Sequence, residues 1–153
     1  MTIFLGADHA GFALRRVLAD WLIGRGYAVA EFGATGEAPY DYPDAAYLVA
    51  DGVASGKASL GVLICGTGIG VSIAANKVEG IRAAVCWNEE SAKLAREHNH
   101  ANIICLGARL ISPDSAVNCM DAFLNTEPST EPRHIRRVEK LDSRCAAGET
   151  VGC

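Results

Sequence analysis

Five short apolar runs, separated by stretches with helical periodicity, are the feature that most constrains the fold of this chain. The runs lack the apolar–polar alternation of a sheet with one wet face, so each strand is expected to be buried on both faces. This pattern predicts an α/β fold: a doubly wound, five-stranded parallel sheet in a three-layer αβα sandwich of Rossmann-like type, with an extra C-terminal helix. The expected strands are 2–6, 28–32, 60–65, 81–86 and 102–106.

The intervening stretches repeat apolar residues at the spacing of amphipathic helices. Gly26 closes the first helix and Asp44 is a candidate N-cap of the second, while Ser112 and Pro113 open a later one. A small-residue helix is expected over 69–76, and the last helix from about Arg133. The expected buried stripes are Leu14, Val17, Leu18, Trp21 and Leu22; Ala45, Leu48, Val49 and Val53; Ser91, Leu94, Ala95 and His98; Ala116, Cys119, Met120, Phe123 and Leu124; and Ile135, Val138 and Leu141.

Length and composition predict one domain over 1–144, with a flexible tail over 145–153 that carries Cys145 and Cys153. The chain has 153 residues and a net charge of −4, and outside one C-terminal cluster it shows no basic surface for nucleic acid. Neither a signal peptide nor an apolar run long enough for a membrane span is apparent, so we expect a cytoplasmic protein without membrane partners. Three further cysteines, Cys86, Cys105 and Cys119, lie in apolar stretches and are interpreted as buried structural thiols.

The segment from Cys65 to Gly70 is the strongest candidate for chemistry. A buried strand ends at Cys65, and three glycines (Gly66, Gly68 and Gly70) lead into a helix. Glycines at this spacing let backbone N–H groups converge at a helix N-terminus, which favours negative charge. The segment lacks the full dinucleotide fingerprint and the Gly-Lys-Ser/Thr of a Walker A loop. A tight turn without any ligand is the alternative reading.

Other candidates stand near the ends of expected elements. Asp8 and His9 directly follow the first strand, at the sheet edge where ligands bind in such folds. His98 continues an apolar helix face, so its ring is expected to point toward the sheet edge. Arg133 and Arg137 share a helix face and could bind a phosphate together, although their spacing alone favours a solvated basic face.

Together these motifs resemble the type B ribose-5-phosphate isomerases, in a family that also holds galactose-6-phosphate isomerase subunits. The resemblance extends from Ile3 to about Leu141. It places the chain in the branch with a cysteine at the loop, because position 65 is Cys and position 74 is Ala. The motifs that carry it are 6–12, 41–43, 64–70, 74–77, 80–83, 98–99 and 107–109, together with Arg133 and Arg137.

The resemblance implies an aldose–ketose isomerase that converts ribose 5-phosphate to ribulose 5-phosphate through a cis-enediolate, in the pentose phosphate pathway. Cys65 would be the general base, His98 would open the sugar ring with help from Asp8, and the N–H groups from Gly66 to Gly70 would stabilise the enediolate oxygen. No cofactor and no metal are expected. Thr67 would contact the reacting oxygens; Tyr42 and Asn99 would position sugar hydroxyls; and the phosphate ligands would be His9, Arg109, Arg133 and Arg137.

The same family shares each active site between two subunits, which implies a homodimer and possibly a tetramer. His98, Arg109 or the C-terminal arginines would then come from the partner. Two alternatives remain: an isomerase of another aldose phosphate, such as a hexose 6-phosphate or a tetrose phosphate, and a non-catalytic module that binds phosphosugars. Retention of Cys65, Thr67, Asp8 and His98 together favours an enzyme over a binding module.

Overall fold

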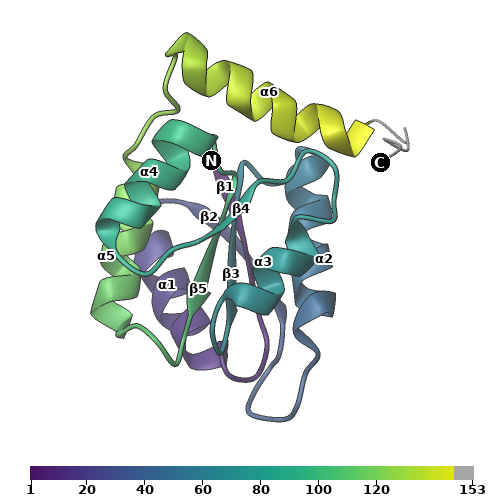
Figure 1. Cartoon of the computed structure of the whole chain (residues 1–153). Helices are drawn as coiled ribbons and strands as arrows, with labels where there is room; N and C mark the ends of the chain where they lie inside the picture. Colours follow the sequence, from purple (N-terminus) through teal and green to yellow (C-terminus); the bar gives the residue numbers. More distant parts are fainter. Residues whose placement is uncertain (147–153) are drawn as a thin grey trace.

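A five-stranded parallel sheet forms the centre of the molecule (Figure 1). The computed structural model describes residues 1–146, and side chains as far as residue 143. The strand order is β2-β1-β3-β5-β4, and every neighbouring pair is parallel, as the apolar runs predict. The strands are β1 (Thr2–Ala7), β2 (Ala28–Gly33), β3 (Leu60–Cys65), β4 (Ala83–Val85) and β5 (Ile103–Gly107).

Helices cover both faces of the sheet, so the three-layer αβα sandwich is confirmed. One core cluster joins the sheet to α1, α4 and α5, and the other joins it to α2 and α3. The central strand β3 is buried along its whole length, which explains its continuous apolar run. The helices are α1 (Phe12–Gly24), α2 (Tyr42–Ala54), α3 (Ile69–Ala75), α4 (Glu89–Asn99), α5 (Pro113–Leu124) and α6 (Pro132–Ala146).

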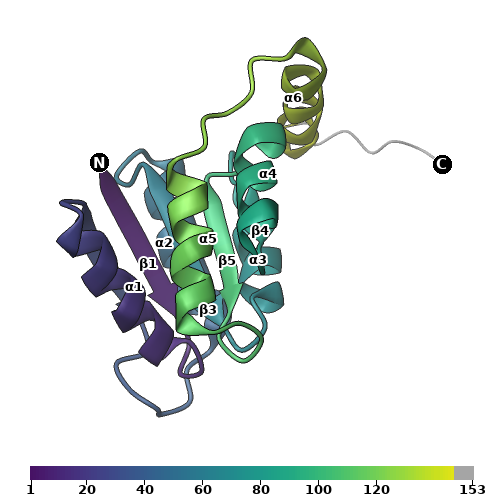
Figure 2. The same cartoon turned by 90° about the vertical axis from the view of Figure 1, so that its left-hand side faces the viewer.

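The last helix, α6, lies outside the sandwich. It follows a linker after α5 and crosses the end of the sheet near the N-terminus of the chain, as both views show (Figures 1 and 2). It packs against α4 and belongs to neither large core cluster. The extra C-terminal helix is therefore confirmed. It extends to Ala146, while residues 147–153 of the expected tail, including Cys153, lie outside the described residues.

Several local predictions are wrong in detail. The second helix begins after Asp41, and Asp44 lies within its first turn. The fourth strand is shorter than expected because the N–H of Arg82 donates to the side chain of Asn102 and not to a neighbouring strand. Four residues of the expected stripes are instead exposed, at the margins of their helix faces: Val17, Leu48, Ile135 and Leu141. The opening of α5 at Ser112 and Pro113 and the burial of Cys86, Cys105 and Cys119 are confirmed.

Parallel strands give the sheet two chemically different edges. At the carboxyl edge the strands run into the loops that start α1, α3 and α4, and the loop before α2 also lies there. At the amino edge lie the end of α4 and the whole of α6 (Figure 2). The candidate site residues divide between these two edges.

Candidate active site

Cys65 is held at the start of α3 by the backbone of its own loop. It is the last residue of β3 and is 4% exposed. The N–H of Gly68 donates a hydrogen bond to its Sγ at 3.1 Å. Gly68 adopts φ +78°, and a Cβ there would lie 3.0 Å from the carbonyl carbon of Leu106, so both conformation and space require glycine. The loop therefore fixes the thiol beside backbone donors.

Thr67 forms the exposed rim of the same loop. Its Oγ1 accepts a hydrogen bond from the N–H of Ile69 at 3.3 Å, at the first turn of α3. The residue is exposed while its neighbours Gly66 and Gly68 are buried. Its hydroxyl is thus available to a ligand above the loop, and its contact with the reacting oxygens stays a prediction.

Asp8 and His9 lie directly after β1, which is the strand beside β3. The N–H of Asp8 donates to the carbonyl of Ile64 at 3.2 Å, so Asp8 is paired with the residue before Cys65. Its carboxylate is buried and accepts a hydrogen bond from the N–H of Gly11 at 2.9 Å. Nδ1 of His9 accepts from the N–H of Tyr40 at 3.3 Å, which leaves Nε2 as the donor of the neutral ring.

Tyr42 and Arg109 approach the glycines of the loop closely. A Cβ on Gly70 would lie 2.7 Å from the ring of Tyr42, and one on Gly66 would lie 3.2 Å from Nη1 of Arg109. The N–H of Arg109 also donates to the carbonyl of Gly66 at 3.0 Å. The small size of these two glycines therefore admits one aromatic and one cationic side chain beside Cys65.

The remaining predicted residues lie at the amino edge of the sheet, away from Cys65. His98 and Asn99 end α4, and Arg133 and Arg137 are exposed on α6. These four residues are therefore divided from the edge that carries Asp8, His9 and Cys65, and the sequence alone did not predict this division. Its reason is topological: α4 starts at the carboxyl edge and runs back across the sheet, so its last residues reach the opposite edge (Figure 2).

His98 meets α6 through a residue that sequence reasoning missed. Its ring stacks on the ring of His134, with centroids 4.2 Å apart and planes inclined by 9°. Burial lowers the pKa of His134 below its ordinary value, and the nearby charges of His98, Arg133 and Arg137 lower it further. The helical spacing of His134 and Val138, which together form the buried side of α6, is the sequence signal that could have identified it.

Arg15 is a second residue that the sequence analysis missed, and its side chain binds the end of β2 at the carboxyl edge. It is 5% exposed although it lies in an amphipathic helix, and its Nε donates to the carboxylate of Glu31 at 3.0 Å. Its guanidinium also donates to the carbonyls of Phe32 and, at 2.8 Å, of Ala34. These contacts fix the end of β2, where the loop toward Tyr42 begins. Arg15 and Arg16 stand side by side in the sequence, and nothing in it marked Arg15 as the buried one of the two.

Residues 3–141 match the sequence model of the Ribose/Galactose Isomerase family. The chain belongs to this family.

Individual members of the ribose/galactose isomerase family agree with that assignment. The structure of ribose-5-phosphate isomerase B from Clostridium thermocellum is 49% identical, covers 94% of this chain and 97% of its own, and has a TM-score of 0.92. That of ribose-5-phosphate isomerase B from Mycoplasma genitalium, with bound ribulose-5-phosphate, is 39% identical at a TM-score of 0.88, with 94% and 95% covered. D-erythrulose-4-phosphate isomerase from Pectobacterium atrosepticum is 45% identical over 129 residues, 83% of this chain and 84% of that protein.

Membership and similarity over nearly the whole chain make this protein an isomerase. In the part of the chain that the structure describes, no three His, Cys, Asp or Glu side chains are grouped so that they could hold a metal ion. Among the described helices, none is both long and apolar enough to cross a membrane.

Proposed function

We propose that this isomerase interconverts ribose 5-phosphate and ribulose 5-phosphate, with Cys65 as the general base. The observation that carries the proposal is the hydrogen bond that the N–H of Gly68 donates to Cys65 Sγ, in a loop that also carries Thr67 and beside the strand end that carries Asp8. A backbone N–H that donates to sulfur stabilises the thiolate, which is the form that can accept a proton. Relatives named for this reaction support the choice of substrate.

The proposed reaction moves one carbon-bound proton from C2 to C1 and one hydroxyl proton from O2 to O1, and it breaks no carbon–carbon bond. The Cys65 thiolate takes the C2 proton of the open-chain aldose, and the electron pair of that bond forms the C1–C2 double bond of a cis-enediolate. Negative charge then develops on the former carbonyl oxygen, where N–H groups of the 66–70 loop would donate to it, other than those of Gly68 and Ile69, which already donate to Cys65 Sγ and Thr67 Oγ1. The thiol returns the proton to C1, the hydroxyl proton of O2 passes to O1, and the electron pair of the O2–H bond forms the carbonyl at C2 while the thiolate is regenerated.

We further propose that each complete site combines two copies of the chain. Ring opening is assigned to His98 with Asp8, yet His98 lies in the last turn of α4 at the amino edge and Asp8 directly follows β1 at the carboxyl edge. The same division separates the loop of Cys65 from Asn99, Arg133 and Arg137. In a two-fold dimer the amino edge of one copy faces the carboxyl edge of the other, so each copy contributes to both sites.

Helix α3 supports this arrangement because it connects the two halves in a single chain. Ile69 begins it beside the loop of Cys65, and Asn76 follows its end and lines a cavity of about 420 Å³ at the amino edge, together with Asn99. Its outer face carries Ile69 and Ile73, which are 53% and 58% exposed. Exposed isoleucines in the segment between two half-sites fit a surface that a second copy covers.

A tetrose phosphate is the second candidate substrate, since the relative from Pectobacterium atrosepticum is named for a four-carbon sugar phosphate. The proton transfer at Cys65 would be the same. The difference lies in the distance from Cys65 to the cationic groups that would bind the phosphate, because a shorter sugar needs a shorter span.

Initial rates on four-, five- and six-carbon aldose phosphates test the assignment. We expect kcat/KM for ribose 5-phosphate to exceed those for erythrose 4-phosphate and the hexose 6-phosphates by at least about tenfold. Preference for the tetrose phosphate would establish the second candidate. Binding of ribose 5-phosphate without any turnover would instead establish a non-catalytic phosphosugar-binding module.

A further inference from the structure

We propose that Arg82 is a positioning residue that holds α6 in place, and with it the arginines Arg133 and Arg137. The inference rests on the proposed function, which assigns the phosphate group of the substrate to these arginines. Arg82 itself lies at the start of β4 and is assigned no contact with substrate. Its proposed action is entirely through α6.

Helix α6 has little packing of its own to fix its orientation. Only His134 and Val138 are buried among its described side chains, whereas Ile135 and Leu141 remain 37% and 53% exposed. Near its first turn the stack of His134 on His98 attaches it to α4. Val138 extends this packing by one turn, but no described side chain after Val138 is buried, so the following part of the helix needs another contact to fix its direction.

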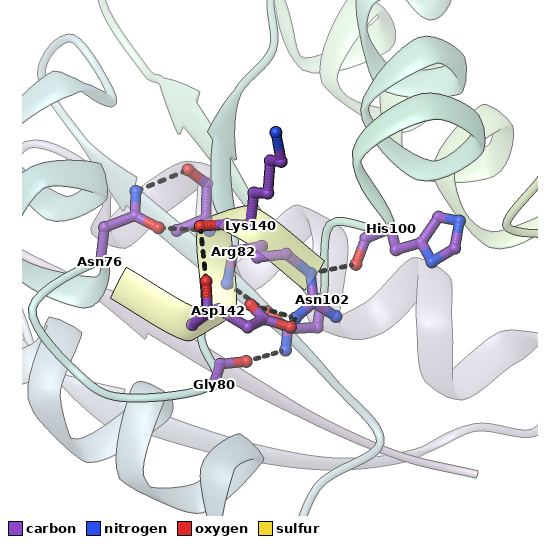
Figure 3. A network of polar contacts seen from close by, with 9 residues as sticks. Asn76, Gly80, Arg82, His100, Asn102, Lys140 and Asp142 are labelled. Atoms are coloured by element: carbon purple, nitrogen blue, oxygen red, sulfur yellow. Dashed lines mark hydrogen bonds and ion pairs between the residues drawn. The ribbon is translucent and has the colours of Figure 1, made fainter. Parts of the chain in front are cut away.

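Arg82 supplies the second attachment. Both carboxylate oxygens of Asp142 lie 2.9 Å from its Nη1 (Figure 3). Asp142 follows His134 by about two turns, or roughly 12 Å along the helix axis. Two contacts separated in this way fix both the position and the direction of the segment that carries Arg133 and Arg137.

Hydrogen bonds from its backbone and its side chain fix the position of Arg82 at the amino edge of the sheet. Its N–H donates to Oδ1 of Asn102 at 2.8 Å, and Nδ2 of Asn102 donates to the carbonyl of Gly80 at 2.8 Å (Figure 3). Its Nε donates to the carbonyl of His100 at 3.1 Å. Since His100 follows His98 and Asn99 directly, one guanidinium connects α6 to the segment that carries the other amino-edge site residues.

A cavity lies beside the ion pair of Arg82 and Asp142, so few other contacts hold this part of α6. Leu141 and Asp142 form one wall of the cavity of about 420 Å³, and Ile81, Ala83 and Asn99 contribute to the rest. The end of α6 therefore lies over a hollow and not over a packed surface. Loss of the ion pair should release this end of the helix while the sandwich stays folded, because a partly exposed pair contributes little to global stability.

The test is Asp142→Asn, with Glu139→Gln as the matched control. Both variants remove one negative charge from α6, but Glu139 is exposed and forms none of the ion pairs found among the described side chains. We expect Asp142→Asn to raise KM for ribose 5-phosphate roughly threefold to tenfold and to leave kcat within about twofold. The inhibition constant of inorganic phosphate should rise by the same factor. Glu139→Gln and the carboxylate-retaining Asp142→Glu should match the parent.

Unchanged KM and unchanged phosphate inhibition in a folded Asp142→Asn variant would overturn the proposal. An equal effect of Glu139→Gln would also overturn it, since charge alone would then explain the result. A parent protein without isomerase activity would refute the proposed function instead. In that case calorimetry of inorganic phosphate binding to the parent and to Asp142→Asn still decides the role of Arg82, and equal affinities would exclude it.

Discussion

Cys65 differs from the other buried cysteines in what surrounds its sulfur. Burial raises the pKa of Cys86 to about 12 and that of Cys119 to about 11, and it raises the pKa of Cys105 well above its ordinary value. These three side chains therefore remain thiols and contribute to packing. Cys65 Sγ instead accepts a hydrogen bond from a backbone N–H at a loop–helix junction. The sequence predicted both classes because only Cys65 precedes a run of glycines.

Replacement of Cys65 by serine tests its role as base. A hydroxyl keeps nearly the same size but does not ionise in the neutral range, so we expect kcat to fall by about 10²–10⁴. The inhibition constant of inorganic phosphate should stay within about twofold, since the phosphate is assigned to other residues. Cys86→Ala is the control and should retain kcat. A Cys65→Ser variant with parental kcat would remove Cys65 from the mechanism.

Gly107 packs closely against the backbone of the 66–70 loop. A Cβ on this residue would lie 2.7 Å from the carbonyl oxygen of Thr67, which is backbone and cannot move without its loop. We expect Gly107→Ala to lower the free energy of unfolding by about 1–3 kcal/mol and to reduce kcat. Gly24→Ala, where nothing lies within 4 Å of the new Cβ, is the control for thermal unfolding and kinetics. Equal stability of the two variants would show that the loop adapts freely.

At the scale of elements, the strands were more predictable than the helix surfaces. Runs such as 60–65 are buried on both sides, so their sequence alone defines them. Helix stripes are less certain, because a residue at the margin, such as Val17 or Leu48, fits the periodicity whether it is covered or exposed. The packing of α6 was the least predictable, since it depends on the pairing of Arg82 with Asp142, far apart in the sequence.

The attachment of α6 should depend on pH through His134. Its pKa lies below the ordinary 6.5, so the folded protein keeps the ring neutral where the unfolded chain binds a proton. The contribution of the neutral His134 ring to the free energy of unfolding is therefore fully present above about pH 6.5 and should decline as the pH falls below it. His134→Phe keeps an aromatic ring for the stack on His98 and cannot titrate. The difference in melting temperature between parent and variant, measured from pH 8 to pH 5, should change sharply below pH 6.5; parallel curves would contradict this origin.

At the scale of the whole molecule, the predicted site residues form two groups at opposite edges of one sheet. The residue types of both halves could be predicted from the sequence, because each stands in a family motif. The division of these residues between two edges could not be predicted from the sequence. It arises from the direction in which α4 returns across the sheet and from the place where α6 packs. Under the proposed function, this chain completes a site only with a second copy of itself.

Complementation between two inactive variants tests the shared site most directly. Cys65→Ala and His98→Ala are each expected to be inactive alone, since every site in either dimer lacks one group. In a two-fold dimer assembled from both variants, one site carries both substitutions and the other is intact. Co-refolding equal amounts should therefore restore roughly a quarter of the parental activity, because half of the dimers are mixed and each has one working site. A mixture as inactive as its components would contradict the shared site.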